Sequence, residues 1–146
     1  MILIFGGTTE GRTAVKVLDE AGSPYYYSTR GNAQQIECKH GTRVAGGMDC
    51  DAMTEFCSTH NIRLIIDAAH PFASLLHTTV ATVSEQLDLP VIRLERRYPP
   101  RDESLVWCDT FDDAIDYLES HEIRDLLALS GVQTITKLQR YWKKHP

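Results

Sequence analysis

The first twelve residues, MILIFGGTTEGR, constrain the fold of this chain more than any other stretch. They begin with an unbroken apolar run, Ile2 to Phe5, whose length suits a central strand covered on both faces. A glycine-rich turn follows at once, and a helix is expected to open at about Glu10. A strand, a glycine turn and a helix in this order predict an α/β fold built on a Rossmann-like, doubly wound parallel sheet.

The glycine turn has the features of a pyrophosphate site. Its glycines let the backbone turn sharply and let a phosphate approach the amides of the following helix. Against the dinucleotide fingerprint G-x-G-x-x-G, Gly6 and Gly11 match, but Thr8 stands where the middle glycine belongs. The threonine hydroxyls could donate hydrogen bonds to a phosphate or cap the helix. We predict that the cofactor-binding residues of the turn are Gly6, Gly7, Thr8, Thr9, Glu10 and Gly11; the alternative is a tight turn that binds nothing.

Composition and charge narrow the class of protein. The chain has 146 residues, enough for one α/β domain or for one domain and part of another, and its 42% hydrophobic and 24% charged residues are ordinary globular values. No apolar run approaches the roughly 20 residues that span a bilayer, and Met1 leads straight into the first strand, so we expect a cytoplasmic protein with no membrane partner. The formal net charge of -5 argues against nucleic-acid binding. The cysteines form no C-x-x-C pair, and no metal site is predicted.

The end of the second expected strand bears on the choice of cofactor. A tyrosine run, residues 25–27, favours a strand that stops at Ser28, Thr29 and Arg30. A Rossmann unit that prefers NAD carries Asp or Glu about 20 residues beyond its last glycine, to hold the ribose 2′-hydroxyl. Here two hydroxyls and a guanidinium stand instead, which suits a 2′-phosphate. The segment therefore predicts NADPH, with NADH as the other nicotinamide option; the alternative is a polar loop with a solvated arginine.

A second polar segment, DAAHPFA at residues 67–73, directly follows the buried-type strand at residues 64–66. Doubly wound sheets bind ligands at the carboxyl ends of their strands, so Asp67 and His70 are candidate catalytic residues. His70 is the candidate proton donor and Asp67 its orienting partner. The alternative is that Asp67 caps a helix and His70 bonds locally.

The helix after this segment is predicted to start near Phe72. Pro71 suits the first turn of a helix, and Phe72 is placed on the inward face by the apolar spacing of the sequence. The same spacing points His77 away from the core, so His77 is predicted to lie on the surface.

A basic group follows the fifth expected strand, residues 89–92. Arg93, Arg96 and Arg97 would lie at the same sheet edge as the glycine turn and His70. Guanidinium groups bind carboxylates in a bidentate manner, so these arginines are predicted to bind an anionic substrate. The alternative is a solvated charged face.

The remaining residues predict the start of a second region. Pro99 and Pro100 suit a linker, and strands are expected at residues 105–108 and 126–129, with helices after Thr110 and near the C-terminus. Two strands and two helices are too few to bury a separate core securely. We expect a dinucleotide-binding domain at residues 1–100, followed at residues 101–146 by the beginning of a second α/β domain that is incomplete.

Three motifs together resemble the precorrin-6A reductase family of cobalamin biosynthesis. They are GGTTEGR at residues 6–12, DAAHPFA at residues 67–73 and RLER at residues 93–96. The later LLALSGVQTI, residues 126–135, resembles the start of the family's second domain. One departure is the Arg97-Tyr98 pair, because the family tends to place a proline directly after the last arginine, which puts the loop after Arg96 and a role for Arg97 in question.

The resemblance implies two Rossmann-like domains and an enzyme of the corrin (porphyrin-type) biosynthetic route. This oxidoreductase would use NAD(P)H to reduce one ring double bond of a small-molecule tetrapyrrole, precorrin-6A or its cobalt form. The arginines would then hold the acetate and propionate arms of the macrocycle. A non-catalytic NAD(P)-binding regulatory or sensor domain remains the alternative, because a Rossmann sheet serves both purposes.

Overall fold

The computed structural model describes residues 1–31, 36–96, 100–131 and 134–145. The chain divides into two compact units, Met1–Arg97 and Tyr98–Pro146. In the described part of the first unit, strands and helices alternate along the chain, except that β3 is the next described element after β2. Its elements are β1 (Ile2–Phe5), α1 (Thr9–Glu20), β2 (Tyr25–Thr29), β3 (Gly41–Ala45), α2 (Cys50–Thr59), β4 (Leu64–Asp67), α3 (Ser74–Leu87) and β5 (Val91–Arg93).

All five strands are parallel and form one sheet with the order β3-β2-β1-β4-β5. The order reverses at β1, so the sheet is doubly wound as the sequence predicts. At the carboxyl edge, Phe5 of β1 lies opposite Ser28 of β2 and Asp67 of β4, and Asp67 lies opposite Arg93 of β5. The register therefore brings the ends of four strands to one edge.

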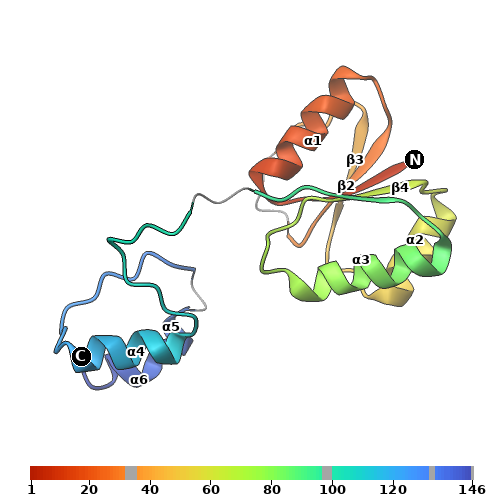
Figure 1. Cartoon of the computed structure of the whole chain (residues 1–146). Coiled ribbons are helices and arrows are strands. Elements are labelled where there is room, and N and C mark those ends of the chain that lie inside the picture. Colours follow the sequence, from red (N-terminus) through yellow and green to blue (C-terminus); the bar gives the residue numbers. More distant parts are fainter. Residues whose placement is uncertain (32–35, 97–99, 132–133, 146) are drawn as a thin grey trace. The chain divides into compact units, whose positions relative to one another are not determined.

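Helices cover both faces of this sheet, with α1 on one face and α2 and α3 on the other (Figure 1). Alternate residues of β1 point to opposite faces: Leu3 joins the core under α2 and α3, and Ile4 joins the core under α1. Both side chains are fully buried, which explains the unbroken apolar run of the sequence.

The start of α3 differs from the sequence prediction. The helix begins at Ser74, and the residues before it form a turn that the Ala73 amide closes by donating to the carbonyl of His70 at 2.8 Å. Phe72 therefore lies outside the helical periodicity, and it is 87% exposed rather than inward. No helix in the described ranges is both long and apolar enough to cross a bilayer.

The second unit contains α4 (Phe111–Ser120), α5 (Thr134–Lys137) and α6 (Gln139–Trp142). The helix expected after Thr110 is α4, and Thr110 and Asp113 form a capping box at its start. The strands predicted at residues 105–108 and 126–129 are wrong, because the part of this unit that the structure describes has no strand. An apolar run becomes a strand only where another strand pairs with it, and here large apolar side chains stay exposed, among them Trp107 and Leu127.

Candidate functional site

The glycine turn between β1 and α1 is packed on a tyrosine of the neighbouring strand. A Cβ on Gly6 would overlap the ring of Tyr27, and a Cβ on Gly11 would lie 2.9 Å from the Cα of Gly6. Gly7 has a φ of +99°, which favours glycine, and its amide donates to the hydroxyl of Tyr27 at 3.0 Å. Each glycine of the motif is thus explained by a close approach or a left-handed backbone.

Thr8, the departure from the fingerprint, caps α1. Its hydroxyl accepts the amide of Gly11 at 3.0 Å and donates to the carbonyl of Ala68 at 2.5 Å. Of the two possibilities that the sequence leaves open for this hydroxyl, the structure shows the cap. The hydroxyl also ties the glycine turn to the residue that follows β4, and the N-terminus of α1 lies just after the carboxyl end of β1.

An ion pair joins the first turn of α1 to the segment after β5. The guanidinium of Arg96 bonds the carboxylate of Glu10 through Nε at 2.9 Å and through Nη2 at 3.3 Å. This bidentate contact, followed by the backbone amide of Glu10 itself, lowers the pKa of the Glu10 carboxyl below its ordinary value of 4.5. Glu10 therefore brings a compensated negative charge to the helix N-terminus.

The end of β2 presents an arginine at the same edge. Ser28 and Thr29 are buried, whereas Arg30 is exposed. The Thr29 hydroxyl donates to the carbonyl of Gly31 at 2.9 Å and so shapes the local turn. Of the three predicted residues, Arg30 is the one that stays exposed at this edge.

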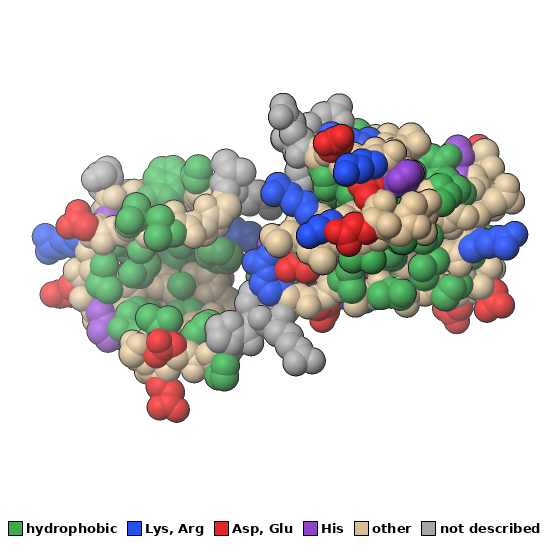
Figure 2. Space-filling model, turned by 90° about the horizontal axis from the view of Figure 1, so that it is seen from above, with side chains coloured by type: hydrophobic (Ala, Val, Ile, Leu, Met, Phe, Trp, Pro, Cys, Tyr) green, Lys and Arg blue, Asp and Glu red, His purple; other side chains and the backbone are tan. Residues whose placement is uncertain are grey.

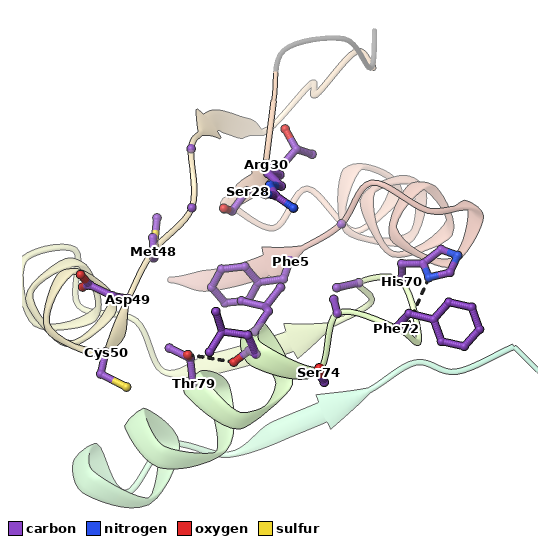
Figure 3. A pocket seen from close by; sticks show the side chains of 18 residues that line it. Phe5, Ser28, Arg30, Met48, Asp49, Cys50, His70, Phe72, Ser74 and Thr79 are labelled. Carbon is purple, nitrogen blue, oxygen red and sulfur yellow. Dashed lines mark hydrogen bonds between the residues drawn. The ribbon is translucent and has the colours of Figure 1, made fainter. Parts of the chain in front are cut away.

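A cavity of about 910 Å³ opens at this edge of the sheet. In Figure 3, Ser28 and Arg30 lie on one side of it, Met48 and Cys50 on a second, and His70 at the far end. The floor is apolar, and Phe5 points into its middle. The volume falls within the range of small-molecule and cofactor sites.

Asp67, at the end of β4, is buried and paired with a histidine that the sequence placed on the surface. His77 Nδ1 lies 2.7 Å from Asp67 Oδ2, and His77 Nε2 lies 3.1 Å from the carbonyl oxygen of His70. The side chains of His77 and Asp67 are 11% and 3% exposed. The surface prediction for His77 is wrong, because helical periodicity takes no account of a partner on the neighbouring strand. Asp67 reaches His70 through His77 rather than directly.

The His70 ring is held by its own turn. The amide of Phe72 donates to His70 Nδ1 at 3.3 Å, and the two rings lie 5.2 Å apart between centroids. An imidazole whose Nδ1 accepts a hydrogen bond carries its proton on Nε2 when neutral; this tautomer is assigned from the contact. His70 is exposed and lines the cavity, so its Nε2–H is a donor available to a ligand.

The predicted arginines already have acidic partners. Arg93 Nε lies 2.5 Å from Glu95 Oε1, and Arg93 Nη1 lies 3.8 Å from Asp67 Oδ2. Arg96 holds Glu10, and Arg97 lies outside the described residues. Figure 2 accordingly shows acidic side chains interleaved with basic ones on the visible face of the first unit. No cluster of three or more His, Cys, Asp or Glu side chains within the described ranges could hold a metal ion.

Comparison with known proteins places the chain in a family. Residues 1–146 match the family model described as precorrin-6x reductase CbiJ/CobK. The chain belongs to this family. It is 30% identical over 148 residues to a precorrin-6A reductase of Rhodococcus erythropolis, covering 97% of this chain and 59% of that protein. It is also 30% identical over 102 residues to a cobalt-precorrin-6A reductase of Synechocystis sp., covering 68% of this chain and 38% of that protein.

A solved structure has the same fold. The chain of CobK precorrin-6A reductase superposes with a TM-score of 0.66 at 24% sequence identity, over 79% of this chain and 46% of that chain. This CbiJ/CobK member thus spans 59% of the length of the Rhodococcus relative and a smaller share of the other proteins compared.

The structure of this CbiJ/CobK member brings together part of the predicted site, whereas Gly7, Thr8, Thr9, Gly11 and Arg93 are not among the residues that line the cavity. Gly6, Ser28, Thr29, Arg30 and His70 line one cavity, and Glu10 and Arg96 pair beside the glycine turn. Asp67 lies behind His70, where it is shielded from solvent. Sequence reasoning missed three features: Tyr27 under the glycine turn, His77 on α3, and the cavity wall at residues 46–50. The Gly46-Gly47 pair directly after β3 could have predicted that wall, because it ends a strand at the carboxyl edge of the sheet, where doubly wound sheets bind ligands.

Proposed function

We propose that the whole protein reduces a ring double bond of precorrin-6A or cobalt-precorrin-6A with NADPH, as a step of corrin biosynthesis. The observation that carries the proposal is the family match over residues 1–146. The shared sheet edge supports it, because Gly6 at the start of the glycine turn, Arg30 after β2 and His70 after β4 line one cavity. A sensor domain would need only the first two of these.

The residues at this edge fit a nicotinamide dinucleotide. The space beside Gly7 is open, and the N-terminus of α1 offers the Thr9 amide and a favourable dipole to a pyrophosphate. The apolar floor and the wall at residues 46–50 could receive the adenosine end, with Arg30 beside it. When bound, the nicotinamide supplies the hydride, and the protein has to orient it and exclude water.

Arg30 is proposed to select NADPH over NADH by contacting the 2′-phosphate. Replacing Arg30 with Ala should weaken NADPH binding by about tenfold, the value of roughly one charge-assisted contact, and leave NADH binding within about twofold. Calorimetric titration of both nucleotides measures this. Arg63→Ala is the matched control, because Arg63 is also exposed but precedes β4 at the opposite edge. An unchanged preference in Arg30→Ala would contradict the assignment.

His70 is proposed to donate the proton that accompanies hydride transfer, from Nε2. The Phe72 amide orients its ring, and His77 supports the backbone of the same turn while Asp67 holds His77. In the full-length parent protein, His70→Ala and His70→Gln should lower the single-turnover rate by about a hundredfold, the lower end of general acid catalysis. NADPH affinity should stay unchanged. A turnover rate equal to that of the wild type would remove His70 from the chemistry.

Arg93 and Arg96 are proposed to bind carboxylate arms of the tetrapyrrole by exchanging their acidic partners for substrate carboxylates. The test of the whole proposal is to incubate the full-length parent with precorrin-6A and with its cobalt form, each with NADPH and NADH. We expect nicotinamide oxidation that depends on the macrocycle. Nucleotide binding without any macrocycle-dependent oxidation would favour the sensor function.

A further inference from the structure

Strand β2 buries two tyrosines on the same face of the sheet, and their hydroxyls have different partners. Tyr25 and Tyr27 are both fully buried in the core under α1. The Tyr25 hydroxyl donates to Asp19 Oδ1 at 2.9 Å, away from the glycine turn. The Tyr27 hydroxyl accepts the amide of Gly7 at 3.0 Å. Of these two tyrosines, it is Tyr27 that bonds the glycine turn, the predicted pyrophosphate site.

The contact with Tyr27 fixes the shape of the glycine turn. The ring of Tyr27 occupies the space where Gly6 would carry a Cβ, and its hydroxyl lies 3.3 Å from where Gly11 would carry one. The Gly7 peptide is turned toward the sheet by its bond to the hydroxyl, at a φ of +99°. Since the amide of Gly6 is also bonded, to the carbonyl of Ser28 at 2.9 Å, the turn is held before any ligand arrives.

The hydrogen bonds within the glycine turn determine which donors can bind a pyrophosphate. The Gly7 amide and the Thr8 hydroxyl are already hydrogen-bonded within the protein, so neither is a free donor for a ligand. Among the amides of the first turn of α1, that of Gly11 donates to the Thr8 hydroxyl and that of Glu10 bonds its own carboxylate, which leaves the Thr9 amide for a ligand. A turn that is already ordered loses less conformational entropy on binding.

We propose that Tyr27 is a positioning residue for the pyrophosphate of the nucleotide, acting through the Gly7 peptide. The inference rests on the proposed nucleotide-binding function and deepens it. Tyr27 holds the turn in the conformation that leaves the Thr9 amide, at the N-terminus of α1, for the ligand. Without the hydroxyl, the Gly7 amide would lose its partner and the turn would rearrange.

The test compares Tyr27→Phe with Tyr25→Phe in the full chain. Each variant removes one buried hydroxyl from the same face of β2, so the two changes disturb the core alike. Calorimetry should show NADPH binding weakened about three- to tenfold in Tyr27→Phe, the effect of one hydrogen bond, and within about twofold of wild type in Tyr25→Phe. Adenosine 2′,5′-bisphosphate, which lacks the pyrophosphate, should bind wild type and Tyr27→Phe equally.

A second measurement needs no substitution. Amide hydrogen exchange should show Gly7 protected both without and with NADPH, whereas the Thr9 amide gains protection only with the nucleotide. Protection of Gly7 that appears only with NADPH would overturn the proposal, and so would equal NADPH affinity in wild type and Tyr27→Phe. An equal loss of adenosine 2′,5′-bisphosphate binding would overturn it too, as a general structural effect. If wild type binds neither NADPH nor NADH, the proposed nucleotide-binding function itself fails. That result differs from equal NADPH affinity in wild type and Tyr27→Phe, which would overturn only the role of Tyr27.

Discussion

Thr8 shows how one hydroxyl can replace a glycine in a dinucleotide motif. Its side chain turns away from the ligand side, caps α1 and bonds the carbonyl of Ala68. The sequence marks Thr8 as the unusual position, and it offers capping as one explanation. It could not decide between capping and phosphate binding, because the carbonyl that draws the hydroxyl inward lies sixty residues away.

Thr8→Val should therefore destabilise the protein, since valine keeps the shape of threonine but has no hydroxyl. We expect the free energy of unfolding to fall by about 1 to 2 kcal/mol from the lost cap and the lost bond to Ala68. Urea denaturation measures it. Thr8→Ser, which keeps the hydroxyl, is the control and should lose less than half as much. Equal stability of wild type and Thr8→Val would mean that the hydroxyl bonds contribute nothing.

At the scale of elements, the patterns that depend on near neighbours are predicted well. Helix α4 begins directly after Thr110 as the sequence indicates, because the capping residue and its helix are adjacent in the chain. The start of α3 is not predicted, because the turn before it is fixed by contacts between His77 of the helix, Asp67 of β4 and the backbone of His70. These contacts, and not the preference of Pro71 for the first turn of a helix, determine that α3 starts at Ser74.

Removing His77 should loosen this turn. In His77→Ala, the buried Asp67 carboxylate keeps the distant Arg93 but loses its closest partner, so we expect a loss of about 2 kcal/mol of unfolding free energy. His77→Asn places an amide donor near the position of Nδ1 and should recover about half of that loss. Urea denaturation of the two variants beside wild type gives both values. Equal losses in the two variants would show that ring packing, not the donor, holds the turn.

At the scale of the whole molecule, the sheet of the first unit follows from the sequence, and the strands expected in the second unit do not. The five strands of the first unit pair with one another, and each apolar run there has a neighbour to bond. The runs at residues 105–108 and 126–129 are similarly apolar, but no strand among the described residues pairs with them. Sequence pattern identifies a segment that suits a strand; pairing depends on the rest of the fold.

The division into units predicts that residues 1–97 fold by themselves. Both core clusters of the sheet consist only of residues of this unit, and so does the cavity of about 910 Å³. A chain ending at residue 97 should show the circular dichroism of an α/β protein, unfold cooperatively in urea, and bind NADPH within about twofold of the 146-residue chain. Among the described residues of the complementary piece, 98–146, the buried core cluster consists of Ile115, Leu138 and Tyr141, so this piece should unfold without a cooperative transition. An unfolded 1–97 chain would refute the domain assignment. A folded one that no longer binds NADPH would instead show that the second unit contributes to the nucleotide site.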